Sequence, residues 1–358
     1  MAVLVTAIHV FFSAKPDVDA RDKPAHDGVN AVHILITGAA GMIGRKLTDR
    51  LLAEGGLNQQ PIERMTLLDV VAAPKPDRAK PALHILTTDL SKPGGAEKII
   101  AQRPDVIFHL AGVVSGEAEL DFEKGYGMNL DGMRALLEGV RKNANGYRPR
   151  LVYTSSIAVF GAPFPPSIPD DFHLTPLTSY GTQKAMGELL LADYTRRGFC
   201  TGIGIRLPTI CVRPGKPNKA ASGFFSGIIR EPLAGMEAIL PVPDSVVHTH
   251  ASPRAAVGFL MHAAGLSPER LGARINFSMP GVSCTVAEQI ASLKRVAGER
   301  VAARIRRERD PLVARIVEGW PQRIEAQRAR ALGFKAESSF DEIVRIHIEE
   351  DRAGQFVA

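Results

Sequence analysis

Apolar and polar positions follow two alternating patterns along the chain, a short apolar run and a longer stretch with helical spacing. The short runs, bounded by glycine or polar residues, are typical of buried strands. They lie at residues 33–37, 65–69, 83–87, 106–110, 151–155 and 203–207. Helical stretches, such as those around residues 133–140 and 185–196, lie between most of them. Because parallel strands need such crossovers, the pattern predicts an α/β fold with a doubly wound parallel sheet.

The pattern changes after about residue 210. Connections become rich in proline, and helical stretches recur at residues 253–264, 285–297 and 339–350. These pieces are short and would have to pack against the large sheet, which favours a dependent region over an independent domain. We therefore expect a sheet domain over residues 32–210 and a smaller, mainly substrate-binding region over residues 211–358. Ligands in such folds bind beyond the carboxyl ends of the strands, where the two parts would meet.

The composition is that of a globular protein. Of the 358 residues, 45% are hydrophobic and 23% are charged, which excludes a disordered chain and a membrane bundle. The formal net charge of +6 raises the question of nucleic-acid binding. Much of the excess lies in residues 300–309, where acidic residues interrupt the arginines and no aromatic side chain can stack on a base. We interpret this segment as a solvated helix or strand face and expect no nucleic-acid partner.

Cysteine use and the amino-terminal segment bear on the compartment. Cys200, Cys211 and Cys284 lack the close spacing of a zinc site and the even number of a small disulfide-bonded domain, which favours a reducing cytoplasm. The first residues form an apolar run that is too short to cross a bilayer and has no basic residue before it. We expect residues 1–31 to be a disordered extension, such as a translation start assigned too early would add, rather than a secretory signal. No membrane partner is expected.

A glycine-rich turn follows the first expected strand. Gly38, Gly41 and Gly44 recur at every third position before an amphipathic helix, and such a turn brings backbone N–H groups close to a pyrophosphate. The same spacing occurs in turns that bind nothing, but here a strand precedes it and a helix follows. Asp69 ends the next apolar run, where a carboxylate can bind the adenosine ribose and repel a 2′-phosphate. This favours NAD, although the basic pair after Gly44 keeps NADP open.

A second candidate site combines a tyrosine and a lysine four residues apart. Tyr180 and Lys184 would share one face of a helix. A nearby cation lowers the pKa of a phenol, which makes tyrosine a usable general base. By itself the pair is more often an ordinary surface pair. The sequence Thr154-Ser155-Ser156, at the end of an apolar run, supplies hydroxyls that could hold a substrate oxygen beside the tyrosine.

Together these residues resemble the extended short-chain dehydrogenases/reductases, a family that includes nucleotide-sugar epimerases and dehydratases. The resemblance covers most of the chain from about His33 to the last helix. Its further motifs are Asp89-Leu90, His109-Leu110-Ala111-Gly112, Asn129 in Met128-Asn129-Leu130, and Ser155-Ser156-Ile157-Ala158-Val159-Phe160-Gly161. The resemblance implies a Rossmann-type sheet, NAD as the cofactor, and an oxidoreductase that acts on a CH–OH group.

The same resemblance implies roles for individual residues. Tyr180 is the acid/base, Lys184 binds the nicotinamide ribose and lowers the tyrosine pKa, and Ser156 orients the reacting hydroxyl. Ser155 is the alternative by register, but the family places its catalytic hydroxyl four residues before the aromatic residue of a Val-aromatic-Gly turn. That residue is usually tyrosine and is here Phe160. The implied cofactor contacts are Gly38, Gly41, Met42, Ile43, Gly44, Asp69, Asp89, Leu90, Leu110, Ala111, Asn129, Ser155, Tyr180 and Lys184.

Longer stretches, at residues 38–47, 161–165 and 206–226, are similar to members of the family that oxidise the C2 hydroxyl of a four-carbon sugar acid with NAD. A carboxylate substrate needs a cation, and arginine suits bidentate binding. The candidates are Arg213, Lys216, Lys219 and Arg254, although any one such residue in a basic protein is more often ordinary surface charge. Ser115 and Glu117 could reach the substrate from the cofactor side. We expect the substrate contacts to be Ser115, Ser156, Tyr180 and Arg213.

Metal, oligomer and alternative functions complete the expectations. His248 and His250 form a pair without a nearby third ligand, which is a poor metal site, so they are interpreted as ordinary histidines and no metal is expected. The family resemblance implies a homodimer through the helices at residues 133–140 and 185–196. One alternative function is a nucleotide-sugar epimerase or dehydratase that retains its NAD and needs a longer groove. The other is a non-catalytic dinucleotide-sensing protein on the same fold.

Overall fold

The computed structural model describes residues 31–76, 81–215 and 222–358. An extension is expected at residues 1–31, and its residues 1–30 lie outside the described residues. Lys216 and Lys219 also lie outside them. Within the described part of the chain, no helix is both long enough and apolar enough to cross a membrane.

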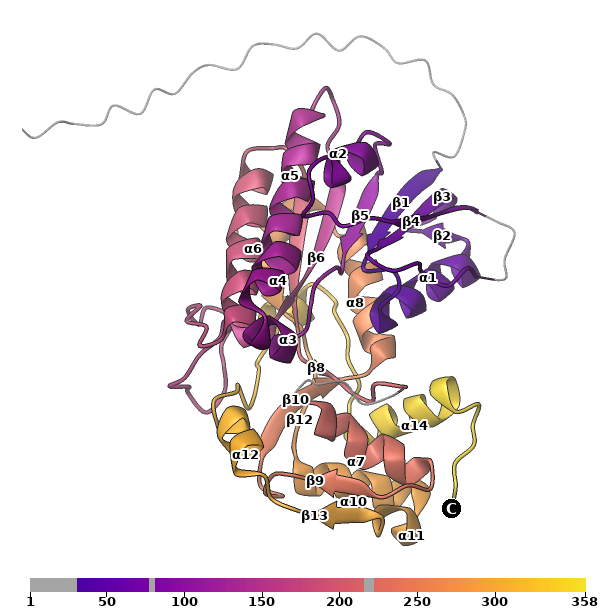
Figure 1. Cartoon of the computed structure of the whole chain (residues 1–358), viewed down its shortest axis with the longest axis vertical. Coiled ribbons are helices and arrows are strands. Elements are labelled where there is room, and N and C mark those ends of the chain that lie inside the picture. Colours follow the sequence, from indigo (N-terminus) through magenta and orange to yellow (C-terminus); the bar gives the residue numbers. More distant parts are fainter. Residues whose placement is uncertain (1–30, 77–80, 216–221) are drawn as a thin grey trace, which may run out of the picture.

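A large parallel sheet organises the fold, as the alternating pattern predicts (Figure 1). Its strands lie side by side in the order β4-β3-β1-β5-β6-β7-β11, every neighbouring pair being parallel. The chain reverses direction across the sheet between β1 and β5, and this switch point is where doubly wound folds bind ligands. The strands are β1 (Val32–Thr37), β3 (Gln60–Asp69), β4 (Ala82–Thr87), β5 (Val106–His109), β6 (Arg150–Ser156), β7 (Thr201–Leu207) and β11 (Asn276–Ser278).

Helices cover both faces of this sheet (Figure 1). On one face α5 packs against α2 and α6, while α8 packs against α1, β6 and β7 on the other. A strand covered on both faces is apolar throughout, and Ile34, Leu35 and Ile36 of β1 are accordingly all fully buried. The helical elements of this part are α1 (Met42–Glu54), α2 (Gly95–Ile100), α3 (Ser115–Leu120), α4 (Phe122–Tyr126), the π-turn η1 (Gly127–Asp131), α5 (Gly132–Lys142), the 3-10 turn η2 (Ile157–Val159), α6 (Ser179–Arg196) and α8 (Pro253–Gly265).

One strand is longer than its apolar run predicts. β3 begins at Gln60 rather than at residue 65, because its start pairs antiparallel with the short β2 (Gly56–Leu57). The two residues between these strands, Asn58 and Gln59, both have positive φ, as a tight two-residue hairpin turn requires. The first residues of β3 are mostly polar, so a prediction based on apolar runs does not include them.

The carboxyl-terminal half builds a second core below the large sheet (Figure 1). Its strands form a three-stranded sheet, β12-β10-β8, and a two-stranded sheet, β13-β9. The strands are β8 (Thr209–Ile210), β9 (Ala238–Leu240), β10 (Val247–Ala251), β12 (Val282–Thr285) and β13 (Ile305–Arg307). The helices of this half are α7 (Gly223–Leu233), α9 (Pro268–Leu271), α10 (Val286–Ala297), α11 (Glu299–Ala302), α12 (Pro311–Glu318), α13 (Gln327–Ala331) and α14 (Phe340–Asp351).

The chain crosses between the two cores more than once. After building β8 and β10, it returns to the large sheet through α8 and β11, whose apolar residues belong to the first core. It then enters the second core again with α10 and α14. The boundary at residue 210 stays a prediction, and the structure adds that residues beyond it complete the large sheet.

Three predicted helices of this half are confirmed, and each has a side-chain cap. Ser252, Thr285 and Ser339 accept hydrogen bonds from backbone N–H groups in the first turns of α8, α10 and α14. The arginine-rich segment at residues 300–309 runs through α11 and β13, and most of its arginines are exposed, as expected. Arg307, for example, pairs with Asp244.

Candidate functional site

The glycine-rich turn has backbone geometry that side chains would block. Gly38 has a φ of +75°, and a Cβ there would lie 2.7 Å from the backbone nitrogen of Ala111 in the turn after β5. A Cβ at Gly44 would lie 2.3 Å from the carbonyl oxygen of Gly38, so this glycine lets α1 start directly against the turn. The loop therefore has the tight turn and close helix packing that a dinucleotide cradle needs.

A cleft of about 850 Å³ opens beside this turn at the switch point between β1 and β5. Asp69 lies in its wall at the end of β3, where its two carboxylate oxygens accept hydrogen bonds from the backbone nitrogens of Ala40 and Val70 at 2.9 and 2.7 Å. These bonds fix a carboxylate at the place expected for ribose recognition. The predicted cofactor contacts that line this cleft are Gly38, Gly41, Asp69, Asp89, Leu90, Leu110 and Ala111. The turn, the cleft and Asp69 together fit NAD.

Three other predicted cofactor contacts lie behind the cleft walls. Met42 is half-buried and Gly44 is buried in the first turn of α1, and Asn129 is fully buried in η1. The Asn129 side chain accepts from the backbone nitrogen of Val113 at 2.9 Å and donates to Gln183 at 2.7 Å. It thereby ties the turn after β5 to α6. Direct contacts of these three with the cofactor stay predictions.

Helix α6 brings the tyrosine and the lysine to the carboxyl end of β6. Thr178 caps this helix by accepting from the backbone nitrogen of Gly181 at 3.1 Å. Gly181 allows close contact with η2, since a Cβ there would lie only 2.1 Å from the carbonyl oxygen of Ala158. That contact sets Tyr180 beside Ser156, the residue at the end of β6, whose hydroxyl acts to lower the tyrosine pKa.

The electrostatics of Tyr180 differ from the expectation. Burial raises the pKa of Tyr180, while the hydrogen bond with Ser156 and the positive charge of Arg213 act in the opposite direction. The pKa-lowering neighbours in the structure are thus Ser156 and Arg213, whereas the sequence suggested Lys184. The Nζ of Lys184 lies 5.8 Å from the centroid of the tyrosine ring, and its contribution to the tyrosine pKa stays a prediction.

Lys184 projects from α6 toward the sheet and is only 4% exposed. Its Nζ donates to the carbonyl oxygen of Thr154 at 2.9 Å. Burial lowers the pKa of Lys184 from 10.5 to about 8, and the charge of Glu188 opposes that shift. A lysine with this pKa is still mostly charged at neutral pH.

The two serines at the end of β6 have different partners. The Oγ of Ser156 accepts from the backbone nitrogen of Ala158 at 3.1 Å, which leaves its own hydrogen for a neighbour in the cleft. The hydroxyl of Ser155 donates to the carboxylate of Glu188, which is also held by the guanidinium of Arg206 through contacts of 2.7 to 3.1 Å. The hydroxyl of Ser155 is therefore bound to the buried ion pair of Glu188 and Arg206. Ser156 is the serine that lies beside the tyrosine.

A smaller cleft of about 310 Å³ adjoins the first one, and Tyr180, Lys184, Ser156 and Ser115 all line it. Arg213 lines it too, where its Nε donates to the carbonyl oxygen of Ile210 at 3.0 Å and its Nη2 to the hydroxyl of Ser222 at 3.4 Å. These bonds hold a half-buried guanidinium at the wall of a small cavity. Of the cations considered for a carboxylate, Arg213 is the one that the described residues bring to the tyrosine. Glu117 lines the larger cleft and pairs with Lys124 instead.

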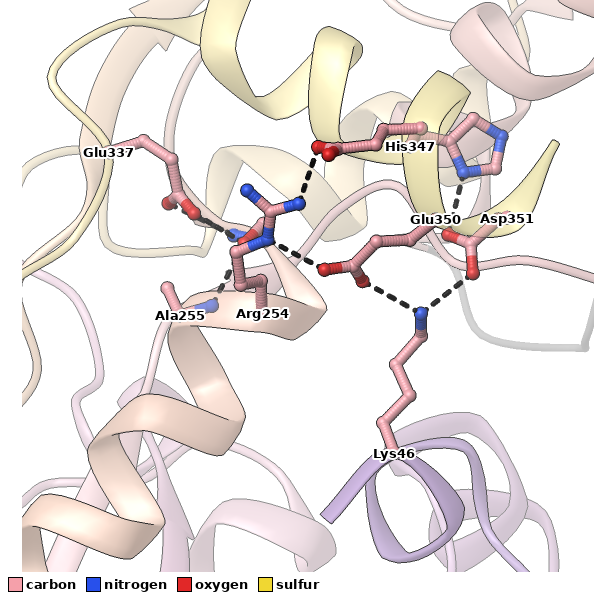
Figure 2. Close-up of polar contacts among 9 residues, drawn as sticks. Lys46, Arg254, Ala255, Glu337, His347, Glu350 and Asp351 are labelled. Atoms are coloured by element: carbon pink, nitrogen blue, oxygen red, sulfur yellow. Dashed lines mark hydrogen bonds and ion pairs between the residues drawn. The ribbon is translucent and has the colours of Figure 1, made fainter. Parts of the chain in front are cut away.

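Arg254 and Lys46 are both engaged elsewhere, in a network of ion pairs with α14 (Figure 2). Lys46 contacts Asp351 at 2.7 Å and Glu350 at 3.1 Å, while Arg254 contacts Glu350 at 2.6 Å. Arg254 also pairs with Glu349. This network excludes Arg254 as a substrate residue and takes Lys46 away from a 2′-phosphate.

Sequence reasoning missed several residues that line the smaller cleft. They are Leu177, Thr209, Ser222, His248 and Trp320. Thr209 lies two residues after the carboxyl end of β7, a position that could have indicated it. Trp320 is the single tryptophan of the chain, but only the fold brings it to β10. His248 was interpreted as an ordinary histidine rather than a metal ligand, and the structure places it in the cleft wall.

Comparison with known proteins places the chain in a family. The model of the NAD dependent epimerase/dehydratase family matches residues 34–247. The chain is 50% identical to the D-erythronate dehydrogenase of Cupriavidus necator, covering 89% of this chain and 98% of that protein. It is 41% identical to the D-erythronate dehydrogenase of Haemophilus influenzae, covering 89% and 99%.

A solved structure, described as the nucleoside-diphosphate-sugar epimerase from Agrobacterium tumefaciens, superimposes with a TM-score of 0.90. It is 59% identical to this chain and covers 93% of it, and the match spans 99% of the solved chain. With the family model spanning the sheet, the glycine turn, the tyrosine and the lysine, this chain belongs to the NAD-dependent epimerase/dehydratase family.

Proposed function

We propose that this protein oxidises the C2 hydroxyl of D-erythronate to 2-oxo-D-erythronate with NAD. The observation that carries the proposal is that the Ser156–Tyr180 hydroxyl pair and the Arg213 guanidinium line one small cleft beside the dinucleotide cleft. A proton acceptor and a carboxylate-binding cation are the two groups that oxidation of a 2-hydroxy acid requires. The likeness to two D-erythronate dehydrogenases over nearly their whole lengths supports the choice of acid.

The cofactor would be held by the turn after β1, with the carboxylate of Asp69 at its ribose and Lys184 at the junction of the two clefts. When bound, NAD supplies the acceptor for the hydride that leaves C2. The remaining chemistry belongs to the side chains of the smaller cleft.

Arg213 binds the substrate carboxylate, which fixes C2 and its hydroxyl near Tyr180. Ser156 uses its free hydrogen to hold the reacting oxygen. Tyr180 in its phenolate form takes the hydroxyl proton on Oη, while the C2–H bond breaks and a carbonyl forms at C2. Before the substrate binds, Ser156 and the charge of Arg213 favour the phenolate against the effect of burial. Lys184 adds a second positive charge behind the ring.

A nucleotide-sugar epimerase is the second candidate, because the solved structure that is 59% identical is described as one. The same serine, tyrosine and lysine would serve that reaction. The size of the smaller cleft favours the acid, since its volume of about 310 Å³ lies at the lower limit of typical ligand pockets. A sugar with a diphosphate and a base would need more room than this cleft offers.

The test is to follow NADH absorbance with the purified protein, NAD and a panel of four-carbon sugar acids and nucleotide sugars. We expect NADH to accumulate with D-erythronate and not with the nucleotide sugars. Conversion of a nucleotide sugar without net NADH, and no reaction of any acid, would contradict the proposal and support the epimerase.

We also propose a homodimer formed through α5 and α6. These helices pack side by side, and α6 exposes Leu189 to 66%, an apolar side chain that a partner helix could cover. Light scattering after gel filtration should give twice the chain mass, and Leu189→Glu should give the monomer. A monomeric wild-type protein would contradict this arrangement.

The compartment we propose is the cytoplasm. All three thiols are buried and unpaired, at Cys200, Cys211 and Cys284, which is typical of proteins kept in a reducing environment.

A further inference from the structure

Thr209 and His248 form a hydrogen-bonded pair in the wall of the smaller cleft. They come from the neighbouring parallel strands β8 and β10. The Oγ1 of Thr209 lies 2.7 Å from the Nε2 of His248, a distance typical of a well-formed hydrogen bond. Neither residue belongs to the catalytic group of Ser156, Tyr180 and Lys184. Neither carries a positive charge at neutral pH, in contrast to Arg213.

The imidazole of His248 is held on several sides. It stacks on Phe225, with centroids 5.1 Å apart and an interplanar angle of 2°, and its centroid lies 5.6 Å from that of Trp320. The backbone carbonyl of Pro321, the residue after the tryptophan, also lies beside the ring and opposes the lowering of its pKa. Burial lowers the pKa of His248 to about 4, so the ring is neutral at physiological pH.

A neutral imidazole carries one proton, on either Nδ1 or Nε2. Nε2 faces Thr209, and the carbonyl of Pro321 beside the ring can only accept, so we infer the tautomer with the proton on Nδ1 and with Nε2 as the acceptor. The hydroxyl hydrogen of Thr209 is then committed to Nε2. What Thr209 offers to the cleft is its oxygen lone pairs, which can accept a hydrogen bond and cannot donate one.

This gives the cleft two polar groups of opposite kind. Arg213 is a pure donor and suits a carboxylate, whereas Thr209 is an acceptor and suits an alcohol. A carboxylate placed at Thr209 would face lone pairs without a hydrogen between them. The two groups therefore specify which end of a hydroxy acid lies where.

Resting on the proposed function, we propose that Thr209, oriented by His248, is a specificity-determining residue that accepts a hydrogen bond from a substrate hydroxyl remote from C2. In D-erythronate the hydroxyl bound by Thr209 is the one on C3 or the one on C4. Analogues that lack one or the other distinguish these two possibilities. His248 acts through Thr209 and is a positioning residue.

The first test compares D-erythronate with its 4-deoxy and 3-deoxy analogues in wild-type protein, Thr209→Val and Thr209→Ser. Valine keeps the shape and removes the hydroxyl, while serine retains it as the matched control. In the wild type, kcat/KM should favour D-erythronate about tenfold or more over the analogue that lacks the contacted hydroxyl, as loss of one hydrogen bond predicts. Thr209→Val should remove that preference through KM, and Thr209→Ser should restore it. Equal losses on all three substrates would overturn the inference.

The second test reads the tautomer of His248 directly by nitrogen-15 NMR, assigned with His248→Asn, and needs no substrate. An unprotonated Nε2 is expected, and a protonated Nε2 would overturn the inference. Failure of the wild type to oxidise D-erythronate would contradict the proposed function together with this role for Thr209. An active enzyme whose substrate preference survives Thr209→Val would contradict the role of Thr209 alone.

Discussion

Three residues at intervals of four along α6, Tyr180, Lys184 and Glu188, connect the reacting group to the buried interior. The tyrosine reaches the smaller cleft, the lysine bonds to the carbonyl oxygen of Thr154, and the glutamate holds both Ser155 and Arg206. The spacing places all three on one helix face. The charge of Glu188 favours the protonated form of Lys184, so the buried ion pair supports the lysine charge at the site.

At this scale we predict that Tyr180→Phe lowers kcat by about 10²–10⁴-fold, the contribution of a general base. The ring remains, so NADH binding measured by fluorescence should stay close to that of the wild type. Tyr126→Phe, which removes a phenol hydroxyl in α4 outside both clefts, is the matched control and should keep full activity. Normal turnover in Tyr180→Phe would rule out its role as the base.

Burial of Lys184 predicts a pH dependence of stability. Its folded pKa is about 8, below the usual 10.5, so between these values the unfolded chain holds a proton that the folded protein has lost. The free energy of unfolding should therefore rise with pH across this window, and the penalty is fully present below it. Relative to Lys184→Met, the wild type should gain about 3 kcal/mol between pH 7 and 10.5.

Urea unfolding of both proteins across that range measures this difference. Lys142→Met, which removes an exposed lysine on α5, controls for the loss of an ammonium group. A difference between wild type and Lys184→Met that does not change with pH would contradict the burial argument.

At the scale of elements, α1 and α14 are joined across the two cores by the ion pairs of Lys46 (Figure 2). α1 follows the glycine turn, and α14 packs in the second core. Burial alone would raise the pKa of Asp351, but hydrogen bonds from His347 and Lys46 bring it below its usual value. The ion pair of Lys46 and Asp351 therefore stabilises the contact between the two cores.

We predict that Lys46→Met lowers the free energy of unfolding by about 1 kcal/mol at low salt, the upper range for a partly exposed pair. The loss should shrink at high salt, because screening weakens the pair in the wild type. Arg50→Met removes a more exposed ion pair from the same helix and is the control, with an expected change of a few tenths. Equal, salt-independent effects of the two substitutions, measured by urea unfolding, would show that the pairs across the cores add nothing specific.

Elements differed in how well the sequence predicted them. The central strands of the large sheet, such as β1 and β5, were predictable because burial on both faces makes them continuously apolar. β8 and β11 have two and three residues, too few for a periodicity. Their places depend on long-range pairing with β10 and β7. For this reason the sequence predicted the cleft residues of β6 and α6 but not those of β8 and β10.

Over the whole molecule, the two cores meet at the carboxyl ends of the parallel strands, and the cleft between them combines residues from distant parts of the chain. Tyr180 and Ser156 could be found from short motifs because each lies at a strand end or helix start. His248 and Trp320 carry no such signal, since only the packing of β10 against the segment after α12 brings them together. The catalytic candidates are thus local in sequence, and the specificity candidates are not.

The account requires that hydride leaves C2 of D-erythronate in a cleft where Tyr180 takes the proton. The most direct measurement is mass spectrometry of both products after turnover of D-erythronate deuterated at C2. We predict that the deuterium appears in NADH, that the acid is recovered as the 2-oxo product, and that Tyr180→Phe strongly reduces both. Deuterium retained in the acid, or absent from NADH while the acid is consumed, would contradict C2 oxidation and with it the central claim.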